Sequence, residues 1–343
     1  SNLTFKPGSD ALECPHCGHR QAIAAQQTRV EEYDFRAALD KARRSPPSAL
    51  VQGGRSDRCN GCGAETVITG QSSHCAFCDS PVEATDAIFV PESVLPFKID
   101  DRKARERFTA WVHSRWFAPS DLRRRAHAAG MDGVYLPYWT YDSQTTTRYT
   151  GKRGEHYYVT ETYRDAQGKP QTRRVQKTRW YPASGTVQVA FDDVLVCASK
   201  SLPRPLVEGL EPWDLKELRP YDPAFLSGFI TERYKIDLEA GFKIAEERMS
   251  PAIEAAIRRD IGGDVQVIAT MNVRHQGVTF KHCLLPLWIS SFRYGDKVYR
   301  FTVNARTGAV SGERPYSAAK ITLFVLFLIA VVVGIVFLVR KYG

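Results

Sequence analysis

The sequence predicts an α+β protein with N-terminal zinc ribbons, two repeated units of helices followed by an antiparallel meander, and one C-terminal transmembrane helix. Three observations lead to this prediction: cysteine pairs near the N-terminus, a short motif that occurs twice, and an apolar run near the C-terminus. A length of 343 residues allows two or three domains beside the apolar run. A hydrophobic content of 43% is enough for a buried core.

The net charge of +9 favours anionic partners for the chain. Cationic side chains near a membrane are attracted to anionic lipid head groups, and the same excess suits nucleic acid. Charge therefore leaves both a lipid bilayer and nucleic acid open as partners. Motifs of phosphate-binding loops, serine hydrolases, zinc proteases and dinucleotide-binding folds are absent from the sequence. This absence favours a protein that is not an enzyme.

Residues 1–27 are predicted to form a partial first zinc ribbon. Cys14 and Cys17 form a C-x-x-C pair that follows a β-like run and a glycine turn. Aligned with the second half of the later ribbon, the opening C-x-x-C of this one falls at or before residue 1. The two thiols would then need His16, His19 or a partner chain to complete a metal shell.

Residues 28–56 are predicted to form a helix and a linker. Thr28 and Glu31 have the spacing of a capping box at the start of a helix that runs to about residue 44. The following stretch, Ser45–Ser56, is rich in Pro, Gly and Ser, a composition typical of linkers.

Residues 57–84 are predicted to form a complete zinc ribbon. Two C-x-x-C pairs are separated by a short hairpin and consist of Cys59, Cys62, Cys75 and Cys78. Four thiolates close a tetrahedral Zn²⁺ shell without an open position, so the metal would be structural. Thiolate sites persist in a reducing compartment, which favours the cytoplasm.

The motif Leu136–Trp139 recurs as Leu285–Trp288 and indicates an internal repeat. We predict a first α+β repeat at 91–200, an irregular connector at 201–230 and a second α+β repeat at 231–315. In the first unit we expect helices from Asp101 and from Ser120 to Gly130, then strands at 135–142, 155–163, 171–181 and 187–199. In the second we expect helices at Leu238–Met249 and from Ser250 to the Gly262–Gly263 pair, then strands at 265–275, 278–294 and 298–304.

The predicted strand before Trp180 carries a basic surface formed by Arg173, Arg174, Lys177 and Arg179. Basic and aromatic side chains on a sheet can bind single-stranded nucleic acid by charge and stacking. They can equally face anionic lipid or solvent, and the membrane span favours that interpretation.

Two further pairs of residues are predicted to have structural roles. Asp192 and Asp193 are adjacent in a predicted strand, so their side chains should point to opposite faces and not form a carboxylate pair. Cys197 and Cys283 lie in apolar strands and are expected to be buried.

The run Ile321–Val339 contains neither a charged residue nor a proline. At about 1.5 Å per residue a helix of this length spans about 28 Å, close to the hydrocarbon core of a bilayer. Lys320, Arg340 and Lys341 flank the run and can reach the head groups. We predict a single transmembrane helix and, since four residues follow it, a tail anchor in the cytoplasmic (inner) membrane with the bulk of the chain in the cytoplasm.

Together these features resemble a bacterial family of zinc-ribbon (TFIIB-type) membrane proteins. The matching residues include the ribbon Cys59–Cys78 and the segments His113–Pro119, Tyr135–Asp142, Phe191–Pro203 and Phe280 to the span. Members usually have two complete ribbons, so the missing first knuckle is a departure. Some members are labelled as related to primosomal protein N′, a superfamily II helicase, although this sequence has no helicase motor motif. The resemblance implies phage-shock or SPFH-type membrane proteins as partners.

The leading functional hypothesis is a non-enzymatic, tail-anchored adaptor or scaffold that acts in a membrane-stress response. The alternative is a membrane-tethered zinc-ribbon protein that binds nucleic acid. A third hypothesis is a thiol redox sensor at Cys14 and Cys17.

Overall fold

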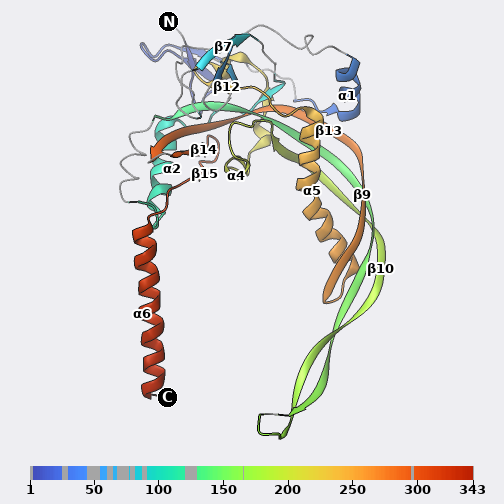
Figure 1. Ribbon diagram of the computed structural model, residues 1–343. Helices are drawn as coiled ribbons and strands as arrows, with labels where there is room; N and C mark the ends of the chain where they lie inside the picture. The colour runs from blue at the N-terminus through green and yellow to red at the C-terminus, as the bar shows by residue number, and fades with distance from the viewer. Residues whose placement is uncertain are drawn as a thin grey trace.

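The computed structural model describes residues 3–24, 30–44, 55–59, 65–67, 77, 82–86, 91–119, 130–164, 166–294 and 297–342. Most strands join one twelve-stranded sheet, and a separate three-stranded sheet lies near the N-terminus. Figure 1 shows a head built on the large sheet, a long β arm that projects from it, and the isolated helix α6. The arm is defined here as residues 143–191, where β9 and β10 leave the head.

Three long strands form the centre of the large sheet: β9 (Asp132–Arg164), β10 (Pro170–Cys197) and β13 (Val265–Tyr294). All three are antiparallel, and β9 lies between the other two. The remaining strands of the sheet are β4 (Tyr33–Asp34), β5 (Arg55–Cys59), β6 (Glu65–Val67), β7 (Val82–Asp86), β8 (Ser93–Val94), β11 (Arg219–Pro220), β12 (Ile230–Glu232), β14 (Lys297–Asn304) and β15 (Val310–Gly312).

Glycines inside the long strands allow close packing and do not end the strands. A Cβ atom at Gly151 would collide with the backbone oxygen of Val267 in the neighbouring strand. A Cβ atom at Gly185 would lie 2.7 Å from the hydroxyl of Tyr149. Both glycines therefore permit an approach that a larger residue would block.

Helix α5 (Leu238–Ile261) covers one face of the proximal half of the arm. The Asp237 side chain caps its start by accepting a hydrogen bond from the Ala240 N–H, and Gly262 follows its last turn with φ of 68°. Its buried side chains recur at every fourth position: Ala245, Met249, Ile253, Ile257 and Ile261. This stripe packs against aromatic residues of β9, including Tyr141 and Tyr149.

Helix α2 (Asp101–His113) packs on the opposite end of the head. Asp100 accepts a hydrogen bond from the Lys103 N–H and caps its first turn. On its buried side the Phe108 ring stacks on Phe301 of β14, with 3.4 Å between ring centroids. The short helices of the head are α1 (Phe35–Arg44), α4 (Arg204–Glu208) and the 3₁₀ turns η2 (Leu215–Glu217) and η3 (Pro223–Leu226).

The predicted fold class is wrong, because the two predicted repeats share one sheet. β9 of the first unit pairs with β13 of the second from Gly154 opposite Val265 to Asp132 opposite Ile289. The two copies of the repeated motif are thereby neighbours, with Leu136 directly opposite Leu285. The chain forms long continuous strands where separate meanders of short strands were predicted.

The predicted N-terminal zinc-ribbon domains are also incorrect as a description of the fold. β6 pairs with β12, placing Val67 opposite Thr231, so β5, β6 and β7 extend the large sheet. The three-stranded sheet of β1 (Thr4–Phe5), β2 (Ala11–Glu13) and β3 (Arg20–Ala22) docks on the head through the buried Phe5 ring. These segments are layers of the head in this structure.

Several predicted helices differ in extent. The first helix begins at Phe35 and not near Thr28, which lies outside the described residues. The helix predicted to begin at Ser120 also falls outside them. The two helices predicted around Pro251 form the single helix α5, with this proline in its interior.

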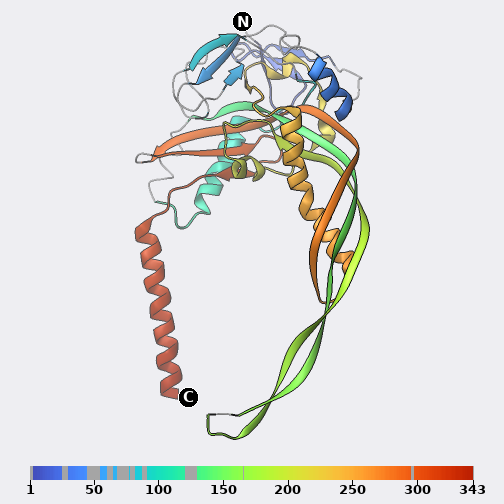
Figure 2. The same cartoon turned by 45° about the vertical axis from the view of Figure 1, so that its right-hand side comes forward.

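Helix α6 (Ala318–Tyr342) has the expected character of a membrane span. Among the described residues it is the one helix long and apolar enough to cross a membrane, with a mean hydropathy of 3.3 and none of that window buried. Its start is fixed to the loop after α2, where the Ser317 N–H donates to the Phe117 oxygen and Lys320 Nζ to the Ala118 oxygen, at 2.8 and 2.7 Å. Figures 1 and 2 show that α6 and the arm leave the same side of the head, while the N-terminal strands lie on the opposite side.

Candidate functional site

The outer half of the arm is a two-stranded ribbon. β13 begins opposite Gly154, so within the described part of the chain the β9 residues beyond this point pair with β10 alone. We name residues 155–164 and 170–179 the distal ribbon. Two strands cannot enclose a hydrophobic core, and every side chain of the distal ribbon therefore faces its surroundings on one side or the other.

The register of β9 and β10 divides the predicted basic surface between two faces. Side chains alternate along each strand, so Arg173, Lys177 and Arg179 share one face and Arg174 lies on the other. On the first face Glu161 accepts from Lys177 Nζ at 3.0 Å and from Arg173 at 3.3 Å. The hydrogen bond from Lys177 is the main reason that the pKa of Glu161 lies below its usual value. Such exposed ion pairs contribute little to stability.

Three arginines of the distal ribbon lie over tyrosine rings. Arg174 lies 4.1 Å from the ring centroid of Tyr158, Arg179 5.1 Å from Tyr157 and Arg173 5.6 Å from Tyr163. The stacked ring orients each guanidinium group, while the rest of its donors stay accessible. Trp180 and Tyr181 extend the aromatic surface at the base of the distal ribbon and are 43% and 41% exposed.

The arm concentrates the positive charge of the protein. Residues 143–191 contain nine Lys or Arg residues and three acidic residues, a net charge of +6 out of +9 for the chain. An anionic surface is the natural counterpart of such a segment. The arm is therefore the candidate interface of this protein.

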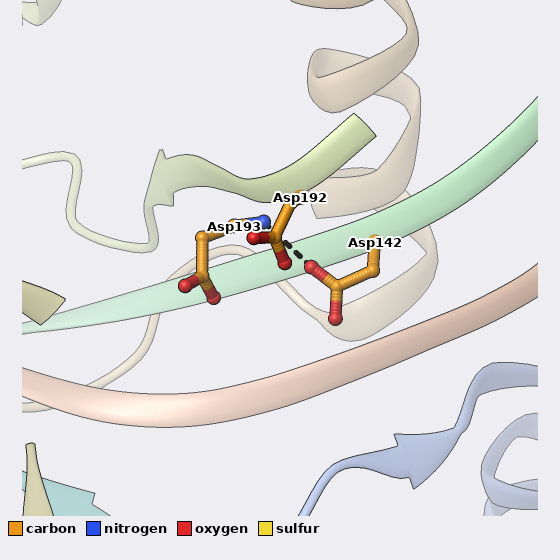
Figure 3. Close-up of side chains that lie close together, drawn as sticks. All are labelled: Asp142, Asp192 and Asp193. Carbon is orange, nitrogen blue, oxygen red and sulfur yellow. Dashed lines mark hydrogen bonds between the residues drawn. The ribbon is translucent and has the colours of Figure 1, made fainter. Parts of the chain in front are cut away.

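A second polar cluster, which the sequence did not predict, lies where the arm leaves the head (Figure 3). The register of β9 and β10 shifts between Phe191 and Val194, and Asp193 adopts φ of 52° in this bulge. As a result Asp142, Asp192 and Asp193 bring carboxylate oxygens within 4.8 Å of one another. The prediction that the adjacent aspartates point apart fails because a bulge breaks the alternation of the strand.

Lys281 compensates part of the charge of this cluster. Lys281 of β13, whose side chain is 10% exposed, places Nζ 2.6 Å from Asp193 Oδ1 and 3.1 Å from Glu32 Oε1. Burial lowers the pKa of Lys281, but its two acidic partners outweigh this effect and the net shift is upward. Burial raises the pKa of Asp142, which accepts from the Asp193 N–H at 2.6 Å. The Lys281 ammonium group is therefore a counter-ion for Asp193, one of the three aspartates of the cluster.

The first predicted metal ligands form a tight turn between β2 and β3. Cys14 is buried, whereas Cys17 and both neighbouring histidines, His16 and His19, are exposed. The Cys14 N–H donates to the His19 oxygen and the Gly18 N–H to the Cys14 oxygen, each at 2.9 Å.

This turn also favours the thiolate form of Cys14. The backbone N–H groups of Cys17 and then His16 are directed at the sulfur and lower the pKa of Cys14. A knuckle of this kind suits half of a tetrahedral thiolate site. The remaining predicted ligands Cys62, Cys75 and Cys78, and the side chain of Cys59, lie outside the described residues.

The two other cysteines lie in the large sheet. Cys283 is fully buried, as predicted, and Cys197 is partly buried beside Tyr138. Burial raises the pKa of Cys197 to about 12 and that of Cys283 further. The thiolate form, which is the reactive one, is therefore disfavoured at both cysteines.

The chain is similar to one functionally uncharacterised protein. YdjG of Bacillus subtilis (strain 168) is 26% identical over 234 residues, which cover 67% of this chain and 65% of YdjG. The alignment thus spans just under two thirds of the relative. No family model and no solved structure match the chain.

Proposed function

We propose that this protein is a non-enzymatic adaptor or scaffold that α6 anchors in a membrane. The proposal is supported by the exposed apolar surface of α6 and by its attachment to a well-packed head. Thiolate metal sites persist in reducing compartments, so we place the head at the cytoplasmic face of the inner membrane.

The observation that carries this proposal is the position of the N-terminal segments relative to α6. The β1–β3 sheet with its cysteine knuckle and the strands β5–β7 lie on the side of the head opposite α6 (Figures 1 and 2). With α6 inserted, this surface is presented away from the bilayer, where a protein can dock. Phage-shock or SPFH-type membrane proteins, which the sequence resemblance implies, are the proposed partners.

Zn²⁺ is proposed as the structural metal of the N-terminal surface. The knuckle around Cys14 and Cys17 fits two thiolate ligands, since its N–H groups face the Cys14 sulfur. Cys59, Cys62, Cys75 and Cys78 supply four more thiols in the sequence. A filled thiolate shell has no open position, so zinc would order the docking surface and not catalyse a reaction.

Co-purification from native membranes tests the proposal. The full chain is extracted in mild detergent and captured by a tag, and bound proteins are compared for wild type, Cys14→Ala/Cys17→Ala and the control Cys197→Ala. We expect a membrane protein to remain bound to wild type and to Cys197→Ala after nuclease treatment. The same protein should be lost from the double variant. Equal recovery with all three would contradict a cysteine-dependent docking surface.

The alternative function, binding of nucleic acid, is supported by the arginine–tyrosine pairs of the distal ribbon. It predicts salt-dependent binding of single-stranded nucleic acid that weakens with Arg173→Ala and Arg174→Ala. Binding that is absent or insensitive to salt would exclude it. In the same co-purification, partners that disappear on nuclease treatment would support this alternative.

A further inference from the structure

We propose that the arm binds the anionic head groups of the bilayer that holds α6, so that the protein contacts its membrane at two separate places. This inference rests on the proposed anchoring by α6 and adds a second membrane contact to it. Three features support this contact: the direction of the arm, the chemistry of its two faces and its charge.

The arm projects toward the side of the head on which the bilayer would lie. In both views it leaves the head on the same side as α6, and its tip extends beyond the C-terminal end of the helix (Figures 1 and 2). A helix that crosses a bilayer from its first turn places the membrane surface directly below the head. With the arrangement of Figures 1 and 2 unchanged, the arm would run into this surface.

The distal ribbon cannot enter the hydrocarbon core. One face of it carries Glu161, Arg173 and Lys177, and the other carries Arg174 together with threonines. Neither face can be turned toward lipid tails. In addition, the outer edge of each of the two strands leaves backbone groups that hydrocarbon cannot satisfy. The head-group layer is therefore the deepest position that the distal ribbon can occupy.

The side chains of the distal ribbon match this layer. Arginine forms bidentate hydrogen bonds with phosphate groups, and tyrosine and tryptophan prefer the boundary between water and lipid. The ribbon offers both kinds in alternation, with guanidinium groups of Arg174 and Arg179 stacked on the rings of Tyr158 and Tyr157. A binding mode that uses charge and exposed rings fits a head-group surface.

Contact along the arm requires α6 to turn relative to the head. In the structure α6 and the arm project in the same direction. An arm that lies on the membrane surface would instead be inclined to a helix that crosses the membrane. The contacts recorded between α6 and the described part of the head lie at its start, through Ser317, Lys320 and the edge contact of Phe324 with Phe117 at 5.4 Å. A change of angle therefore rearranges these contacts and leaves the core of the head intact.

Energy transfer between the arm and the membrane tests the proposal on the full chain. A fluorescent amino acid replaces the exposed Thr172 in the distal ribbon, and the protein is reconstituted in nanodiscs with acceptor-labelled head groups. The discs contain phosphatidylcholine with or without phosphatidylglycerol. We expect transfer to rise when phosphatidylglycerol is present and to fall again at high salt, since exposed charges are screened.

Matched variants assign the contact to the basic surface. Arg174→Gln/Lys177→Gln removes two positive charges from the distal ribbon, whereas Arg36→Gln/Lys41→Gln removes two exposed charges from α1. We expect the ribbon variant to lose the phosphatidylglycerol-dependent rise and the α1 variant to retain it. Transfer that ignores phosphatidylglycerol, or an equal response from both variants, would overturn the proposal.

Two further measurements distinguish a failure of the proposed anchoring from a failure of the proposed arm contact. Resistance of the protein to alkaline extraction from vesicles reports on insertion of α6, so its loss contradicts the proposed anchoring and not the arm contact alone. The fluorescence of the amino acid at position 172 is also measured with a single-stranded oligonucleotide. A change with the oligonucleotide but not with phosphatidylglycerol would overturn lipid binding in favour of nucleic acid.

Discussion

The head and the distal ribbon are built from the same two strands but differ in what surrounds them. In the head, β9 lies between two strands, and its Tyr135 and Tyr141 side chains are fully buried. In the distal ribbon, β9 has one neighbour among the described strands, and Tyr158 is 54% exposed. Aromatic residues therefore stabilise the core in one region and are available for contacts in the other.

The difference indicates which residues are constrained by folding. Burial of an apolar side chain in the head contributes about 1.5–3 kcal/mol, whereas an exposed pair in the distal ribbon contributes at most about 1 kcal/mol. The distal ribbon adds little to stability, yet it belongs to the arm, which carries a net charge of +6 out of +9. Such a segment is best explained by an interaction. Substitutions in the two regions should consequently separate stability from membrane contact.

The largest effect on stability is expected from the stripe of α5. Ile257→Ala removes a fully buried side chain that packs between the helix and the sheet. We expect a loss of about 2–5 kcal/mol in the free energy of unfolding, from lost burial and the cavity left behind. Val159→Ala in the distal ribbon is the control and should cost less than about 1 kcal/mol. Denaturant unfolding in detergent measures both, and equal losses would refute the division between head and distal ribbon.

Lys281 gives the next largest effect. Lys281→Met leaves Asp193 and Glu32 without their shared counter-ion and should cost about 2–3 kcal/mol, less than for a fully buried pair because the carboxylates are partly exposed. Lys177→Met removes an exposed partner of Glu161 and should change stability by less than about 1 kcal/mol. A melting temperature for Lys281→Met close to that of Lys177→Met would show that the acidic cluster does not depend on Lys281.

Asp142 should make stability depend on pH. Its pKa is raised in the folded protein, chiefly by burial, so the folded state binds the proton more tightly than the unfolded state. Stability from this group is present below its unfolded pKa of about 3.9 and is lost as the pH rises through the folded pKa. Asp142→Asn removes this loss, so the stability of the variant relative to wild type should increase as the pH is raised above about 4. Unfolding curves at several pH values test this, and a constant difference would exclude the effect.

The smallest effect is expected at Glu161. Glu161→Gln removes the acceptor charge between Arg173 and Lys177 and should alter the free energy of unfolding by less than about 0.5 kcal/mol. It also raises the net positive charge of the distal ribbon. We therefore expect stronger energy transfer in the assay with anionic nanodiscs, while unfolding remains nearly unchanged.

The elements that the sequence predicted correctly are those with strong local signals. The structure confirms a helix over the apolar run Ile321–Val339 and the helix that begins at Asp101. The basic residues lie along a strand, as predicted. Each depends on hydrophobic pattern, capping or β-branched content within one segment. The zinc ligands stay a prediction, because most of them lie outside the described residues.

The arrangement of the sheet could not be predicted, because its determinants act between distant residues. Gly151 and Gly185 lie between the strands expected from the sequence, but in the structure they lie inside long strands and permit close contacts with Val267 and Tyr149. The acidic cluster likewise depends on a bulge that gives Asp193 a positive φ, for which adjacent aspartates are a weak signal. In both cases the partner strand decides the local conformation.

Hydrogen exchange of the full chain in nanodiscs tests the central claim most directly. The distal ribbon has no core to protect its amides, so a membrane contact should slow their exchange. We predict slower exchange in residues 155–164 and 170–179 when phosphatidylglycerol is present than in phosphatidylcholine alone, with unchanged exchange in α5. Equal exchange of the distal ribbon in both kinds of disc would contradict the account.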